Sequence, residues 1–163
     1  MDPQPRFEDE LVSLLPRLRR FAHSLSRSPA DADDLTQATV ERAIRSRDQW
    51  TPGTRVDSWL YRIMRNLWID TARSRSRKEK FEAPPEEAAN VGEDSAVEAS
   101  MELTRIMSAM QQLPDEQREV VSLILIEGFG YREAAELLDL PIGTVSSRLV
   151  RGRTALLGLV GER

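Results

Sequence analysis

The chain of 163 residues contains no cysteine and only one histidine, His23. The lack of cysteine excludes a disulfide framework and thiolate metal ligands. The single histidine argues against a histidine-built metal site or a Ser/His/Asp triad, and its surroundings are typical of a helix surface. Neighbouring carboxylates such as Asp33 and Asp34 point to different faces of a helix and make no acid/base pair. We therefore expect no catalytic residue, no metal and no cofactor.

Long apolar runs are also missing. No segment approaches the roughly 20 apolar residues that a helix needs to cross a bilayer. The first five residues, Met-Asp-Pro-Gln-Pro, lack the basic and then apolar profile of a signal peptide. These features predict a cytoplasmic protein without membrane insertion.

No stretch shows the strict alternation of polar and apolar residues that is typical of a β-strand. Apolar residues instead recur every three or four positions, as in Phe7, Leu11, Leu18 and Leu25, which predicts amphipathic helices. Pro16 is expected to kink the first helix or to mark a restart. The pattern predicts an all-α protein with helices at about 7–25, 30–46, 56–76, 96–112, 115–127, 131–138 and 142–158.

The net charge of −4 is unevenly distributed along the chain. Basic side chains are in excess over residues 1–78, whereas acids dominate between residues 79 and 102. Residues 79–95 combine a Pro-Pro pair, glycine and clustered acids with few large apolar groups, so they cannot bury enough surface to offset the entropy of ordering. We expect two small helical domains, 6–78 and 96–160, joined by a flexible acidic linker at 79–95.

The clearest local pattern is a helix-turn-helix over residues 131–153. Ala134 and Ala135 allow two helices to approach closely, Pro141 separates them, and Val145 and Leu149 fill the angle between them. The outer face of the second helix then offers hydroxyl and guanidinium groups that can reach base edges or phosphates in a major groove. The candidate DNA-binding residues are Thr144, Ser146, Ser147, Arg148, Arg151 and Arg153. The alternative is a solvated face that carries these residues without contacting DNA.

The segments 113–121, 127–135 and 141–148 together resemble the fourth conserved region of extracytoplasmic-function (ECF) sigma factors. In that family this region binds the minus-thirty-five promoter element and the β flap of RNA polymerase. The run 31–43 independently resembles the second sigma region, where a helix docks on the β′ clamp. The resemblance implies docking through Asp34, Gln37 and Glu41, with Ala38 standing where the family often has glutamate. A solvated acidic face is the alternative for this run.

The block 52–70 is similar to the family's reader of the minus-ten element, which holds a base flipped out of the melted strand. Asn66 matches the position that commonly lines the base pocket, and an amide offers both a donor and an acceptor to a base edge. The resemblance implies that Arg55, Arg62, Arg65 and Asn66 form the minus-ten site. A surface or packing amide remains the alternative for Asn66. Trp59 is expected to pack in the core.

The resemblance covers nearly all of residues 7–158. It implies a dissociable sigma factor that binds core RNA polymerase, selects promoters and helps to open promoter DNA. The resemblance also implies a role in a stress response and inhibition by an anti-sigma factor. Two other functions stay open. A stand-alone helix-turn-helix regulator would leave residues 30–70 unexplained, and a sigma mimic that sequesters an anti-sigma factor would not need Asn66 or the polar face of the recognition helix.

Overall fold

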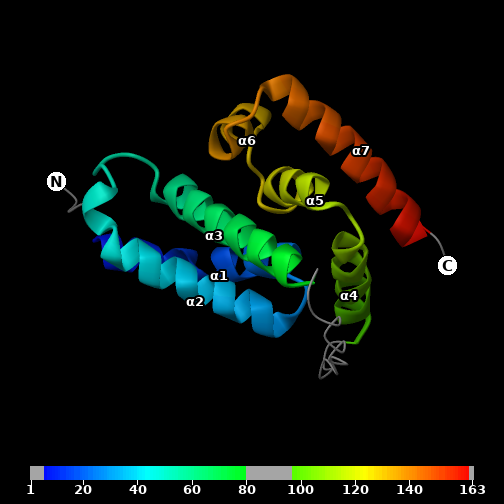
Figure 1. Ribbon diagram of the computed structural model, residues 1–163, viewed down its shortest axis with the longest axis horizontal. Coiled ribbons are helices and arrows are strands. Elements are labelled where there is room, and N and C mark those ends of the chain that lie inside the picture. The colour runs from blue at the N-terminus through cyan, green and yellow to red at the C-terminus, as the bar shows by residue number, and fades with distance from the viewer. Residues whose placement is uncertain (1–5, 80–96, 162–163) are drawn as a thin grey trace.

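The computed structural model describes residues 6–79 and 97–161, and every regular element within these ranges is helical (Figure 1). The predicted linker at 79–95 lies outside the described residues except for Glu79. The elements are α1 (Phe7–Leu25), α2 (Pro29–Arg45), a short 3-10 turn η1 (Arg47–Gln49), α3 (Val56–Glu79), α4 (Val97–Gln111), α5 (Asp115–Val121), a π-helical turn η2 (Ser122–Ile126), α6 (Tyr131–Leu138) and α7 (Ile142–Gly161). The all-α prediction is confirmed.

The N-terminal half is a bundle of α1, α2 and α3 (Figure 1). Its fully buried side chains include Leu18, Phe21, Leu60 and Met64, which come from the apolar faces of α1 and α3. Helix α1 runs from Phe7 to Leu25 without a break, so of the two expectations for Pro16, a kink or a restart, the restart was wrong. Pro16 lies on the exposed side, while Leu11 and Leu18 on either side of it are buried. The packing of these leucines outweighs one lost backbone hydrogen bond.

Helix α2 begins one residue earlier than predicted because Ser28 caps it. The Ser28 hydroxyl accepts a hydrogen bond from the Asp31 amide at 3.1 Å, and Pro29 occupies the first helical position.

The Ser28→Ala variant should lower the free energy of unfolding by about 1 kcal/mol because it leaves that amide without its acceptor. Chemical denaturation followed by circular dichroism measures the change. Ser13→Ala is the matched control, since the exposed Ser13 lies within α1 and bonds only the Glu10 carbonyl. Alanine there should be neutral or slightly stabilising, and equal losses in both variants would contradict the capping role.

In the C-terminal half, α5, α6 and α7 surround a second core that contains Val120, Val121, Val145 and Leu149. The chain turns between α6 and α7 at Asp139, whose φ of 55° and ψ of 50° are left-handed. Such a residue ends a helix sharply, since it redirects the chain after the last turn. The predicted helix-turn-helix is present at the predicted positions.

The two halves are in contact rather than apart, as Figure 1 shows for α1 against α4 and α5. Tyr61 of α3 is fully buried and has the rings of Phe21 and Phe129 at centroid distances of 4.9 and 5.0 Å. Phe129 belongs to the C-terminal half, so the aromatic contact continues the N-terminal core across the boundary.

Arg118 of α5 is a buried cation at the same boundary. Its guanidinium donates to the carbonyl oxygens of Met110, Gln111, Leu113 and Leu25 at 2.7 to 3.1 Å. Gln111 also donates to the Ser26 carbonyl. Residues of the C-terminal half therefore satisfy two carbonyl groups at the C-terminal end of α1, which otherwise lack helical partners. Burial lowers the pKa of Arg118, although an arginine stays protonated under any ordinary condition.

Candidate functional site

The candidate residues of the recognition helix lie along α7. Val145 and Leu149 are buried against the rest of the C-terminal half, while Ser147, Arg151 and Arg153 are exposed. Thr144, Ser146 and Arg148 are half-buried, so the prediction that the whole set faces outward is only partly right. Arg148 is drawn inward because its guanidinium lies 3.6 Å from a carboxylate oxygen of Glu116 on α5.

Arg151 is held along the helix surface. It donates to the Ser147 carbonyl at 3.3 Å and to the Ser147 hydroxyl at 3.4 Å, one turn earlier. These long, exposed contacts are weak and can be exchanged for contacts to a phosphate or a base.

The three candidate polymerase-binding residues share one exposed face of α2. Asp34, Gln37 and Glu41 follow one another at three- and four-residue spacing, which places them on one side of a helix. Gln37 donates to Glu41 at 3.3 Å, and Arg45 lies 3.8 Å from the same carboxylate group. The face therefore presents Asp34 and Glu41 with Gln37 between them, and Arg45 continues the polar row beyond Glu41.

The minus-ten candidates lie where α3 meets the C-terminal half. Arg62, Arg65 and Asn66 line a hollow of about 650 Å³ together with Glu136, Leu137 and Asp139. Arg62 donates to the Glu136 carbonyl at 2.8 Å, and Arg65 makes a two-pronged ion pair with Glu119 at 3.0 and 3.3 Å. The structure thus brings three of the four candidates together, and two of them are already bonded to the other half of the chain.

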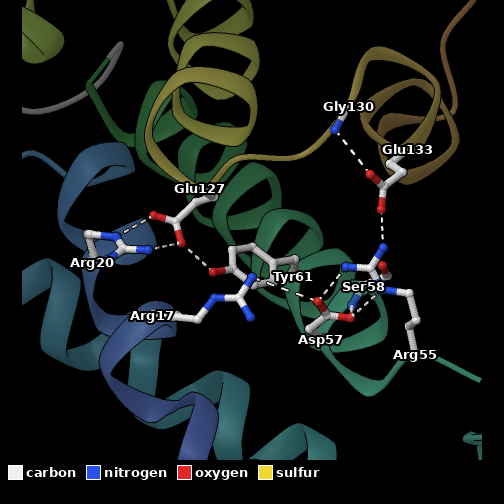
Figure 2. A network of polar contacts seen from close by, with 9 residues as sticks. All are labelled: Arg17, Arg20, Arg55, Asp57, Ser58, Tyr61, Glu127, Gly130 and Glu133. Carbon is white, nitrogen blue, oxygen red and sulfur yellow. Dashed lines mark hydrogen bonds and ion pairs between the residues drawn. The ribbon is translucent and has the colours of Figure 1, made fainter.

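The fourth candidate, Arg55, lies before α3 in a separate network (Figure 2). It makes two hydrogen bonds to Asp57, at 2.7 and 3.1 Å, and one to Glu133 at the start of α6. The hydrogen bonds to Asp57 are the main cause of the raised pKa of Arg55. Burial opposes ionisation of Asp57, yet its contacts with Arg55, the Ser58 amide and Arg17 lower its pKa overall.

Sequence analysis missed the acids of the C-terminal half that face arginines of the N-terminal half. Glu127 is the most enclosed of them, as Figure 2 shows: it accepts two hydrogen bonds from Arg20, at 2.7 and 3.1 Å, and one from the Tyr61 hydroxyl. Burial and this bond raise the pKa of Tyr61. Helical periodicity carries no signal for such pairs, because it predicts which face is apolar but not which distant polar group will lie opposite.

Comparison with known proteins identifies both halves. The family model described as Sigma-70 region 2 matches residues 11–78, and that described as Sigma-70, region 4 matches residues 103–156. The ECF RNA polymerase sigma factor EcfG of Rhodopseudomonas palustris is 36% identical over 152 residues, which cover 93% of this chain and 83% of that protein. The chain belongs to the ECF sigma factor family.

Solved structures extend the similarity to the arrangement of the halves. The sigma factor RpoE of Bartonella quintana, solved in complex with the anti-sigma factor NepR, matches this ECF sigma factor with a TM-score of 0.84 and 34% identity, over 96% of this chain and 98% of that one. CnrH, solved in complex with the cytosolic domain of CnrY, matches with a TM-score of 0.67 and 28% identity, over 94% and 89% of the two chains. The same topology therefore occurs in a sigma factor bound by an anti-sigma factor, and in CnrH bound by the cytosolic domain of CnrY.

In the described part of the sigma factor, residues 6–79 and 97–161, no helix combines the length and the apolar character needed to span a bilayer.

Proposed function

We propose that this ECF sigma factor binds core RNA polymerase in the cytoplasm and directs it to promoters through two domains, 6–78 and 96–160, joined by the segment 79–95. The observation that carries the proposal is the presence of both sigma regions, in order, on one chain. Asp34, Gln37 and Glu41 contact the β′ clamp. Arg55, Arg62, Arg65 and Asn66 read the minus-ten element, and the polar face of α7 reads the minus-thirty-five element while its domain touches the β flap.

Promoter binding requires the two halves to separate from the arrangement seen here. Arg65 and Arg148, one from each DNA-binding set, line the same hollow of about 370 Å³. The names of the two promoter elements place them about 25 base pairs apart, or roughly 85 Å along B-form DNA. Because Arg65 and Arg148 lie at a single hollow, the closed protein cannot contact both promoter elements at once. Polymerase therefore binds the sigma factor in a more open form.

Run-off transcription with purified bacterial core polymerase and a promoter library tests this function. Initiation should depend on the protein and should fall by roughly 5- to 150-fold in Asn66→Ala and in Arg148→Ala, since a well-placed base contact contributes about 1–3 kcal/mol. Arg19→Ala is the control, because its exposed pair with Asp33 lies outside the candidate surfaces. Normal initiation by both variants would remove these residues from the site.

Core binding is measured separately, with labelled sigma factor and core polymerase. The triple variant Asp34→Ala, Gln37→Ala, Glu41→Ala should lose affinity for core, whereas Asn66→Ala and Arg148→Ala should keep it. A protein that binds core but never initiates would favour the sigma mimic, and one that ignores core but protects an operator would favour the stand-alone regulator. An anti-sigma factor is the expected inhibitory partner, since the similar RpoE of Bartonella quintana was solved in complex with the anti-sigma factor NepR.

A further inference from the structure

The contact between the two halves is built on arginines of the N-terminal half and glutamates of the C-terminal half. Between described residues on the two sides, three such ion pairs join Arg20 to Glu127, Arg65 to Glu119, and Arg55 to Glu133. The Glu127 and Glu119 side chains are only 0% and 4% exposed, whereas that of Glu133 is 42% exposed. Because exposed ion pairs contribute little, the pairs of Glu127 and Glu119 are the more important of these three ion pairs.

Glu127 depends wholly on the opposite half for its side-chain hydrogen bonds. Both of its carboxylate oxygens are bonded to Arg20, and one also accepts from Tyr61. A buried carboxylate is costly unless such charge-assisted bonds satisfy it, and it is well solvated when exposed to water. Glu127 is therefore stable in two situations, with the halves closed around it or with the halves apart.

The π-helical turn η2 places this carboxylate at the boundary. The Glu127 amide donates to the Ser122 carbonyl, five residues earlier, and the Phe129 amide donates to the Leu123 carbonyl at 2.9 Å. A π-turn adds a residue to the helical turn and so changes which side chains face a neighbouring element. In this chain Glu127 and Phe129 both face Tyr61.

Glu119 binds Arg65, a residue that the proposed function assigns to contact with DNA. Its carboxylate covers the Arg65 guanidinium with the two-pronged geometry that a phosphate would use, and the Arg65 side chain is left only 20% exposed. Arg62 is exposed and donates one hydrogen bond to the Glu136 carbonyl. The closed arrangement thus covers Arg65 and engages Arg62 with acceptors from the same chain, while Asn66 stays exposed.

We propose that Glu119 and Glu127 form an intramolecular latch, which holds the two halves closed in the free protein and masks the minus-ten arginines until the halves separate. The masking rests on the proposed function, whereas the closure does not. The latch needs no anti-sigma factor, because every one of its groups belongs to this chain.

The closure is tested by a distance measurement on the full chain. The absence of native cysteine allows two spin labels to be attached at exposed positions in opposite halves, through Asp48→Cys and Thr154→Cys. Pulsed electron paramagnetic resonance should give one narrow distribution of label-to-label distances for the doubly labelled parent protein. Adding Glu119→Gln and Glu127→Gln should create a second population at longer distance, with the helical circular dichroism signal retained.

The masking is tested by the affinity for a single-stranded DNA oligonucleotide, measured by fluorescence anisotropy. If about nine in ten molecules of the parent protein are closed, the Glu119→Gln, Glu127→Gln variant should bind the oligonucleotide about tenfold more tightly. The reason is that apparent affinity scales with the fraction of molecules that are open and able to bind. The control is the double variant Asp9→Asn, Glu102→Gln, which changes the net charge equally at exposed sites.

Three outcomes decide the proposal. A longer distance together with DNA binding tighter than in the control supports it. An unchanged distance distribution overturns the latch. A longer distance with no tightening beyond the control overturns the masking. Failure of the proposed function would appear separately, as the absence of run-off initiation by the unmodified protein.

Discussion

Replacing Arg118 with methionine should lower the free energy of unfolding by about 3–5 kcal/mol. Methionine fills a similar volume but donates no hydrogen bond, so the carbonyl oxygens of Leu113 and Leu25 lose their donor and that of Met110 keeps only the Leu113 amide. Each buried acceptor without a partner costs about 1–3 kcal/mol. For a chain of this size the thermal midpoint should fall by roughly 10 °C, as measured by circular dichroism on heating.

Arg132→Met is the matched control for this variant. Arg132 is exposed on α6, so its replacement should change the free energy of unfolding by no more than about 0.5 kcal/mol. Similar midpoints for the two variants would show that the Arg118 guanidinium is not needed to join α4, α5 and the end of α1.

Gly152→Val should destabilise the C-terminal half by about 2–3 kcal/mol. A Cβ at Gly152 would lie 2.7 Å from Cγ2 of Val121 and 3.2 Å from Cβ of Gln117, so α7 would be forced away from α5. Overfilling a well-packed contact costs about 1–3 kcal/mol, and valine restores little of the helix propensity that glycine lacks. Chemical denaturation monitored by circular dichroism measures the loss.

Gly158→Val separates this clash from the general effect of a glycine replacement. No atom lies within 4 Å of a Cβ built at Gly158, further along the same helix. The Gly158 variant should therefore stay within about 0.5 kcal/mol of the parent protein. Because Gly152 follows Arg151 directly, its replacement should also weaken initiation from promoters, and an unaffected transcript level would argue against a fixed position of α7 on α5.

The helices could be predicted from the sequence because each carries its own local signals. Predicted bounds at 131–138 agree with α6, and Pro141 marks the start of α7. The predicted helix at 115–127 is instead α5 followed by a π-turn. The sequence did not reveal the π-turn, because the four consecutive apolar residues 123–126 show no clear helical period. The prediction that Trp59 packs in the core is consistent with its contact with Phe7, whose ring centroid lies 5.9 Å away.

The arrangement of the two halves could not be predicted. Arg20 and Glu127 are 107 positions apart, and arginine and glutamate are mostly exposed to solvent in folded proteins. Nothing local in the sequence distinguishes a carboxylate that will be buried from one that stays in water. The individual DNA-binding and polymerase-binding roles remain predictions for the same reason, since they depend on groups outside this chain.

The carbonyl groups at the end of α1 also affect how easily the joint between the halves can open. Leu25 and Ser26 accept hydrogen bonds from Arg118 and Gln111, and water molecules can take over both positions as the side chains withdraw. Separation then exchanges one set of hydrogen bonds for another, with only a modest enthalpy change and no melted helix. The joint is expected to behave like a transient protein-protein interface, so that cycles of association with polymerase can open and reclose it without refolding either half.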